Sequence, residues 1–92
     1  MRKYEYLYIF DPQEEKTKKA IEEVKDNYNK MEVRVLKETE MGKRQLAYVI
    51  NKNTDGFYYM TQIEIDDFTR LQEFETDLKL NKKVIRFMKV RI

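Results

Sequence analysis

The chain has 92 residues, with 19 lysine and arginine residues against 17 aspartate and glutamate residues, and a formal net charge of +2. A chain of this length fits one domain with a modest core, and we expect residues 1–92 to form that domain. Because the sequence contains no cysteine, histidine or serine, it excludes disulfides, catalytic triads built on these residues and histidine zinc sites. Catalysis by carboxylates alone and metal binding through oxygen ligands stay open, but the acidic residues mostly alternate with lysines, as on a solvated helix face. We therefore expect no enzymatic activity, no metal site and no small-molecule substrate.

The sequence carries no sign of a membrane segment or a secretion signal. No apolar run approaches the roughly 20 residues of a membrane-spanning helix. The first residues lead directly into a strand pattern and lack the apolar region of a signal peptide. We therefore expect a cytoplasmic protein with no membrane partner.

Residues 4–10 alternate as in a β-strand, and residues 11–31 follow with helical spacing. One face of the strand carries the aromatic side chains of Tyr4, Tyr6, Tyr8 and Phe10. The helix is expected to begin with Asp11 as N-cap, Pro12 at the first helical position and Glu14 completing a capping box. Its apolar stripe consists of Ala20, Ile21, Val24, Tyr28 and Met31.

Two further segments rich in β-forming residues predict a hairpin. Residues 32–50 form a long strand that is interrupted near Gly42, because a glycine within a strand pattern commonly marks a bulge. A polar loop from Asn51 to Asp55 leads into a third strand over residues 56–65.

The last part of the chain predicts a helix followed by a strand. Asp66 and Asp67 are expected to cap the helix, whose apolar positions are Phe68, Leu71, Phe74 and Leu78. After a turn at residues 81–83, residues 84–92 form the final strand. The element order β-α-β-β-α-β predicts a ferredoxin-like α+β sandwich, a four-stranded antiparallel sheet with both helices on one face. The crossovers are expected to place the first and third strands at the centre as a parallel-related pair.

Strand alternation divides the apolar residues between the two faces of this sheet. The face under the helices is expected to carry Tyr6, Tyr8, Phe10, Tyr59 and Ile63. The open face is expected to present a partner-binding surface formed by Leu7, Ile9, Tyr58, Met60, Met88 and Val90.

The phase of the last strand is open at this level. If Phe87 faces inward, Lys89 and Arg91 share its side, and their long side chains must reach out to solvent near the end of the sheet. The opposite phase would bury Met88 and Val90 instead.

Positive charge gathers at three places in the sequence. Residues 79–92 include no acidic residue. The cations in this stretch are Lys79, Lys82, Lys83, Arg86, Lys89 and Arg91. Further cations stand at residues 2–3 and 43–44. Clustered positive charge is typical of a contact with a phosphate backbone.

Five segments, in order and at matching spacing, resemble the bacterial small-subunit ribosomal protein six family. They are Arg2-Lys3-Tyr4-Glu5, Asp11-Pro12, Gly42-Lys43-Arg44-Gln45-Leu46-Ala47-Tyr48-Val49-Ile50, Gly56-Phe57 with Gln62-Ile63-Glu64, and residues 78–88. The resemblance implies a structural, non-enzymatic protein of the small ribosomal subunit, without a cofactor, that binds 16S ribosomal RNA jointly with small-subunit ribosomal protein eighteen. Lys89 departs from the family pattern, since relatives often carry an apolar residue there.

Within this resemblance, the cations are candidates for contacts with RNA phosphates, which position RNA without reading its sequence. The candidate RNA-binding residues are Arg2, Lys3, Lys43, Arg44, Arg86 and Arg91, with Lys52, Lys82 and Lys83 as secondary candidates.

The main alternative is an RRM-like module that binds single-stranded RNA, which shares this topology. Its third strand carries aromatic residues that stack on bases, and residues 55–62 match that pattern at the glycine and two aromatic positions. An RRM exposes Phe57 and Tyr59, whereas the ribosomal hypothesis turns both toward the helices. An acylphosphatase-like enzyme is disfavoured, because the loop at residues 11–15 is acidic and lacks glycine.

Overall fold

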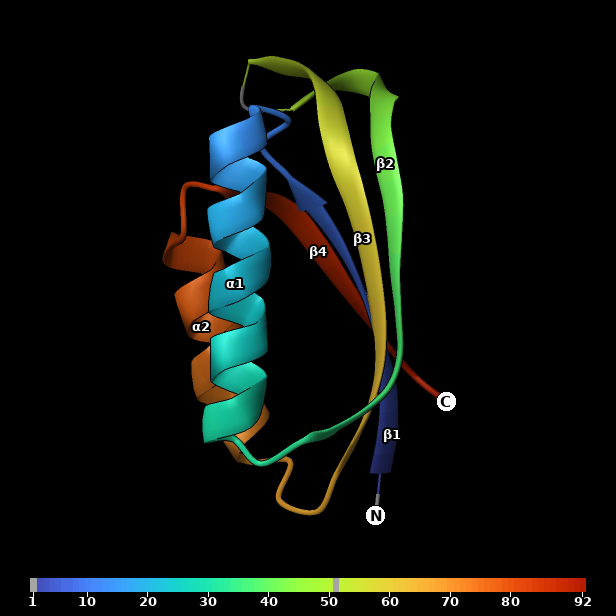
Figure 1. Cartoon of the computed structure of the whole chain (residues 1–92), viewed down its shortest axis with the longest axis vertical. Coiled ribbons are helices and arrows are strands. Elements are labelled where there is room, and N and C mark those ends of the chain that lie inside the picture. Colours follow the sequence, from blue (N-terminus) through green and yellow to red (C-terminus); the bar gives the residue numbers. More distant parts are fainter. Residues whose placement is uncertain (1, 51) are drawn as a thin grey trace.

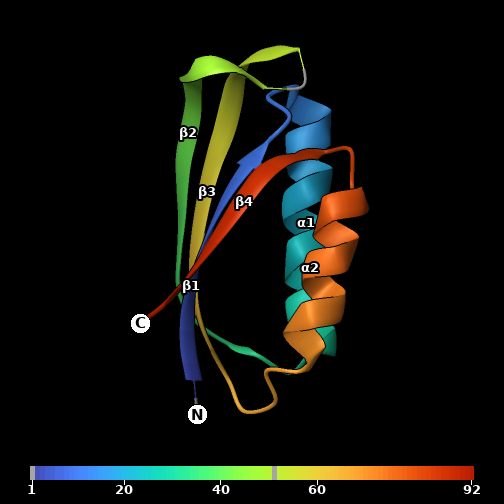
Figure 2. The same ribbon diagram turned by 180° about the vertical axis from the view of Figure 1, so that it is seen from behind.

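In the computed structural model, which describes residues 2–50 and 52–92, the elements follow the order β-α-β-β-α-β (Figure 1). They are β1 (Arg2–Phe10), α1 (Glu14–Lys30), β2 (Arg34–Ile50), β3 (Asn53–Ile65), α2 (Arg70–Leu80) and β4 (Val84–Arg91). Both helices pack on one face of the sheet and leave the other face open (Figures 1 and 2). The predicted ferredoxin-like fold is confirmed. Within the described ranges, neither helix is long and apolar enough to cross a membrane.

The sheet has the strand order β2-β3-β1-β4, so β1 and β3 are central as predicted. They pair antiparallel, with Leu7 opposite Met60 and Tyr8 opposite Tyr59. The expectation of a parallel-related pair was therefore wrong. A crossover through α1 makes β1 and β2 run in the same direction, and β3, which returns from β2 by a hairpin and lies between them, must run against both.

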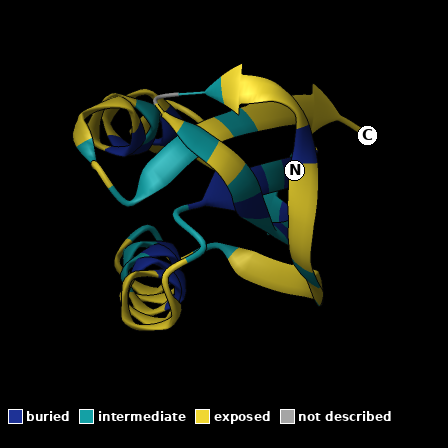
Figure 3. Cartoon of the chain, turned by 90° about the horizontal axis from the view of Figure 1, so that it is seen from above, coloured by how far each residue is buried: buried dark blue, intermediate teal, exposed yellow. Residues whose placement is uncertain are grey.

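The face under the helices holds an aromatic core built from alternate residues of the central strands. The predicted set of Tyr6, Tyr8, Phe10, Tyr59 and Ile63 is confirmed, since each side chain is 0% exposed. The Tyr8 ring stacks between its two neighbours along β1, with centroids 5.7 Å from Tyr6 and 5.4 Å from Phe10. The helices cover this layer with Ala20, Ile21, Val24, Tyr28, Leu71, Phe74 and Leu78. Seen from above, each helix is buried on its sheet side and exposed on the other (Figure 3).

A chain of hydroxyl groups crosses this core. Tyr28 Oη lies 2.6 Å from Tyr8 Oη and 2.6 Å from Thr61 Oγ1, so one helix residue joins both central strands. Burial raises the pKa of Tyr28 to about 12 and raises the pKa of Tyr8 well above the usual value for a tyrosine. All three hydroxyls therefore stay neutral and hydrogen-bonded at physiological pH.

Two further buried hydroxyls, Tyr6 Oη and Tyr59 Oη, have no hydrogen-bond partner in the part of the chain that the structure describes. Burial raises the pKa of both phenols well above the usual value, and the negative charges of Glu75 near Tyr6 and Glu38 near Tyr59 act in the same direction. Each of these carboxylates is engaged in an ion pair with a lysine.

The start of α1 differs from the sequence prediction. The helix begins at Glu14 with Gln13 as N-cap, and no side chain among the described residues caps it, so the predicted capping box is not formed. Asp11 instead shapes the preceding turn. Its Oδ1 accepts the Gln13 backbone N–H at 3.0 Å, and its carbonyl accepts the Thr17 hydroxyl at 2.6 Å. Asp side chains form such local turns as readily as they form caps.

The start of α2 is also later than predicted. The helix begins at Arg70 after Thr69, and the Asp67 carboxylate again accepts a turn bond, from the Thr69 N–H at 3.1 Å. Phe68, which was predicted on the apolar stripe, is 39% exposed. Its ring lies under the Arg2 guanidinium carbon, 3.7 Å from the ring centre.

The hairpin between β2 and β3 is tighter than predicted. Ile50 pairs with Asn53, so β3 begins three residues before its predicted start at Gly56. Residue Asn51, the first of the predicted loop, lies outside the described residues.

The predicted interruption of β2 is confirmed as a bulge. Glu40 pairs with Tyr59 and Gly42 pairs with Tyr58, which leaves Met41 as the extra residue. Gly42 has a φ of +91°, a conformation that glycine adopts without the steric cost of a side chain.

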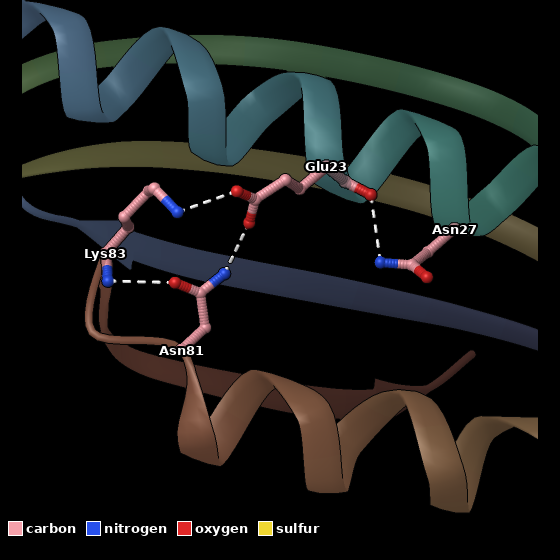
Figure 4. A network of polar contacts seen from close by, with 4 residues as sticks. All are labelled: Glu23, Asn27, Asn81 and Lys83. Atoms are coloured by element: carbon pink, nitrogen blue, oxygen red, sulfur yellow. Dashed lines mark hydrogen bonds and ion pairs between the residues drawn. The ribbon is translucent and has the colours of Figure 1, made fainter.

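A polar network ties α1 to the turn that precedes β4 (Figure 4). Glu23 accepts from Asn81 Nδ2 at 2.6 Å and from Lys83 Nζ at 2.7 Å, and its backbone carbonyl accepts from Asn27 Nδ2 at 2.9 Å. Burial opposes the ionisation of Glu23, but the bonds from Lys83 and Asn81 outweigh it and hold the pKa of that carboxyl below its usual value. The network fixes where β4 enters the sheet.

Candidate protein and nucleic-acid interfaces

The open face of the sheet presents an apolar surface close to the predicted one. Leu7, Tyr58 and Met60 are half-buried at its centre. Met88 and Val90 on β4 are 44% and 56% exposed. These five residues lie on neighbouring strands, where Leu7 is opposite both Met60 and Met88. A continuous apolar surface of this kind is typical of a binding site.

Ile9 is the exception, since it lies on the open face but is only 6% exposed. The end of β2 covers it. A Cβ placed on Gly56 would lie 2.4 Å from Ile9 Cγ2 and 3.3 Å from Leu46 Cδ2, so these side chains meet directly above the glycine. Ile9 therefore lies on the open face as predicted, but it is buried there, and the expectation that it is exposed was wrong.

The structure settles the phase of β4. Phe87 packs against the aromatic core. Lys89 also faces inward, and its stem carries the ammonium out to Glu75 on α2, at 2.9 Å, above the Tyr4 ring, whose centre is 5.3 Å away. This contact explains how a lysine occupies an inward position where an apolar residue was expected. Met88 is left facing outward, as predicted.

The six candidate RNA-binding residues form two groups at opposite ends of the sheet. Arg2, Lys3 and Arg91 lie where β1 begins, since Arg91 pairs with Tyr4 and the Lys3 carbonyl accepts the Ile92 N–H at 3.0 Å. This group lies next to both ends of the described chain.

The second group consists of Lys43, Arg44 and Arg86. Arg44 pairs with Gly56 and Arg86 pairs with Ile9, which places this group near the far end of β1. At about 3.3 Å per residue, residues 2 and 9 of β1 lie roughly 23 Å apart. The two groups are therefore too far apart to contact the same phosphate group.

The candidates also differ in the face that they occupy. By strand register, Lys3, Arg44 and Arg86 lie on the open face, whereas Arg2, Lys43 and Arg91 lie on the side of the helices. The sequence prediction grouped all six together, and the structure brings together only half of them on the face that carries the apolar surface.

Internal contacts engage some of the cations and leave others without an ion pair. Lys83 is paired with Glu23 and Lys89 with Glu75, so these two lysines of the acid-free tail are neutralised inside the protein. Lys82 has no ion pair within residues 2–50 and 52–92, and neither do the six candidate RNA-binding residues.

Sequence reasoning missed Tyr48 as part of the site. Its hydroxyl accepts a hydrogen bond from Arg86 Nη1 at 2.8 Å, although β2 and β4 are the two edge strands of the sheet. The end of β2 must therefore fold across the open face, which agrees with the turn of the β2 ribbon seen from above (Figure 3). Alternation alone gives no signal for such a bend.

The direction of Tyr59 decides against an RRM-like mode of binding. Tyr59 is fully buried beneath the helices, with its ring centre 5.9 Å from Tyr8 and 5.8 Å from Phe10. Phe57 packs against the same core. Neither ring is available to stack on a base, so these two positions do not form the aromatic platform of an RRM.

These observations define a class of protein: a ferredoxin-like binding module with an apolar open face and, among the described residues, unneutralised cations at both ends. The family described as Ribosomal protein S6 matches residues 3–91. The chain is 37% identical to the small ribosomal subunit protein bS6 of Fusobacterium nucleatum, covering 99% of this chain and 98% of that protein. It is 38% identical to bS6 of Shouchella clausii, covering 96% and 94%.

A solved structure agrees with the sequence comparison. The crystal structure of 30S ribosomal protein S6 from Thermotoga maritima superposes with a TM-score of 0.88 and 30% identity, over 99% of this chain and 87% of that chain. The chain therefore belongs to the ribosomal protein S6 family. It is a structural, non-enzymatic protein of the small ribosomal subunit, as the sequence resemblance implied, and its place is on the cytoplasmic ribosome.

Proposed function

We propose that the protein binds 16S ribosomal RNA jointly with small-subunit ribosomal protein eighteen. The observation that carries the proposal is the composition of the open face. An apolar centre runs across β1, β3 and β4, and cations without an ion pair in the described residues flank it at both ends. In this proposal the protein partner covers the apolar centre, and the cations contact phosphates of the RNA.

The apolar centre supports the protein contact. Met60 lies at its middle, opposite Leu7. A carboxylate introduced there would be desolvated without a partner when protein eighteen binds, a loss of about 3–5 kcal/mol for an unpaired buried charge. We expect Met60→Glu to abolish pairing while the isolated protein stays folded, since the side chain is only half-buried. Pairing is measured by titration calorimetry with purified protein eighteen.

A matched control is available on the opposite layer. Leu80 at the end of α2 is 76% exposed, so Leu80→Glu makes the same apolar-to-acid change away from the sheet and should leave pairing unchanged. Ile9→Glu is not a suitable variant, because it would place a charge in a buried position. If Met60→Glu pairs as tightly as Leu80→Glu, the open face is not the protein contact.

The cations support the RNA contact. Lys43 and Arg44 lie within β2, just after the bulge at Met41, and have no ion pair among the described residues. Replacing both with alanine should weaken binding of a 16S fragment in the presence of protein eighteen. The slope of log affinity against log salt should become shallower by about 1 for each phosphate that the variant no longer neutralises. The control is Lys18→Ala on α1, where the lysine pairs with Glu14. An unchanged salt slope in the double variant would remove these two residues from the RNA contact.

A further inference from the structure

A cavity of about 220 Å³ lies on the open face beneath the folded end of β2. We call it the roofed pocket, and its walls include Ile9, Leu46, Tyr48, Tyr58, Arg86 and Met88. Ile9 and Leu46 are buried beneath it, at 6% and 8% exposure. The flat apolar surface of the sheet thus ends in a concave, largely apolar site.

The roof of this pocket is held across the sheet. The hydrogen bond from Arg86 Nη1 to the Tyr48 hydroxyl joins the end of β2 to β4. Tyr48 is nevertheless 62% exposed, so its ring stands out from the protein while its hydroxyl is anchored. Neither residue belongs to the aromatic core.

The positive charge at the pocket has no acidic partner among the described residues. The guanidinium of Arg86 carries five N–H donors, and one of them donates to the Tyr48 hydroxyl. The described residues that line the pocket include no carboxylate. Arg44 lies two residues before Leu46 and faces the open side by its register with Gly56. The site therefore combines apolar walls with a positively charged rim suited to an anion.

We propose that the roofed pocket receives an apolar or aromatic side chain of the protein partner, with a neighbouring carboxylate that pairs with Arg86. This inference rests on the proposed pairing with protein eighteen and names the anchor of that interface. Interfaces concentrate their binding energy where a side chain fills a desolvated pocket, and the surrounding flat contacts exclude water. The pocket adjoins the apolar surface through Tyr58 and Met88, so one partner can cover both.

An unpaired RNA base is the competing occupant, and the lining argues against it. Aliphatic side chains form much of the wall, and Tyr59, which would extend a stacking platform on β3, points into the core.

The first experiment measures pairing with protein eighteen, without RNA, for two pocket variants. Arg86→Glu should weaken pairing about 30-fold or more, because it sets two negative charges against each other at a desolvated contact. Tyr48→Ala should weaken it by about tenfold or more through loss of a pocket wall. The control is Lys79→Glu, which makes the same charge reversal at an exposed residue of α2 and should change the affinity by less than about threefold.

The second experiment uses the unaltered chain and so does not depend on how the variants fold. In the complex with protein eighteen and a 16S fragment, nuclear Overhauser contacts are measured from the Ile9 and Met88 methyl groups. Contacts to side-chain protons of protein eighteen support the proposal, and contacts to base or ribose protons overturn it in favour of RNA.

The two proposals fail in distinguishable ways. If Met60→Glu abolishes pairing while Arg86→Glu and Tyr48→Ala leave it unchanged, the open face is the interface but the pocket is not its anchor. If all three variants pair normally, the open face is not the protein contact and the pocket proposal fails with it. If the unaltered chain does not pair with protein eighteen, the proposed function itself fails.

Discussion

The hydroxyl of Tyr28 should be worth more to stability than any other phenol in the core. Tyr28→Phe removes one oxygen but breaks two hydrogen bonds, to Tyr8 Oη and Thr61 Oγ1, both at 2.6 Å. The two strand residues are 0% exposed and Tyr28 is 2% exposed, so water does not replace the missing partner. A buried hydroxyl left unpaired costs about 1–3 kcal/mol, and two of them give a predicted loss of about 2–6 kcal/mol.

The matched control is the same chemical change at Tyr59. Its hydroxyl is equally buried but has no hydrogen-bond partner in the described part of the chain. Removing a buried polar group that is already unsatisfied is neutral or stabilising, so Tyr59→Phe should change the free energy of unfolding by less than about 1 kcal/mol. Tyr6→Phe should behave in the same way, because its hydroxyl likewise has no partner among the described residues.

Urea denaturation followed by circular dichroism measures both effects. For a domain of this size, a loss of about 2 kcal/mol lowers the melting temperature by roughly 8–16 °C, and the urea midpoint should fall by about 1–2 M at an unchanged slope. The reasoning is refuted if Tyr59→Phe is as destabilising as Tyr28→Phe. The loss of stability would then depend on the burial of the ring and not on its hydrogen bonds.

Three other variants probe the packing and the titrating groups of the fold. Gly56→Ala should cost about 1–3 kcal/mol through overpacking, because the new Cβ would lie 2.4 Å from Ile9 Cγ2; urea midpoints measure this, and an unchanged midpoint would contradict it. Burial raises the pKa of Tyr28 from 10.0 to about 12. The contribution of the neutral phenol to stability is therefore complete below pH 10 and is lost as the pH rises toward 12, by about 1.4 kcal/mol per pH unit. The free energy of unfolding of Tyr28→Phe should fall less steeply with pH in this range than that of the unaltered protein. Because the Glu23 pKa is lowered from 4.5, its carboxylate stabilises the fold above pH 4.5, and Glu23→Gln should lower the free energy of unfolding there by under about 1 kcal/mol. This deficit should vanish as acid titrates the carboxylate of the unaltered protein. A deficit that does not change with pH would assign the effect to packing.

Alternation along the central strands was enough to predict the two faces of the sheet. The pattern of β1 placed Tyr8 in the core and Leu7 on the open face, and β3 followed the same rule. The pattern of β4 was ambiguous because Lys89 shares the inward side with Phe87. Only the position of Glu75 on α2 makes an inward lysine favourable, and no local pattern contains that information.

Charge counting predicted where cations gather but not which of them are available. Lys83 belongs to an acid-free stretch of sequence, yet it pairs with Glu23, which lies sixty residues earlier. Asp11 shows the same limit for helix ends. Aspartate is a common N-cap residue, but here the Asp11 carboxylate accepts the Gln13 backbone N–H in the turn that precedes the helix. Partner choice among polar groups depends on tertiary geometry.

The bulge at Met41 in β2 decides what the open face presents. β2 has bulges at Leu36 and at Met41. If only the Met41 bulge were absent, Met41 would take the pairing position of Gly42, and the following residues of β2 would change faces. Arg44 would then face the helices, and Leu46 would lie away from Ile9. The extra residue reverses that exchange, places Arg44 and Leu46 on the open face, and so allows the end of β2 to roof the pocket. A glycine with a φ of +91° makes this register change without strain. The feature that sequence analysis marked only as an interruption therefore positions the site through which we propose the partner is recognised.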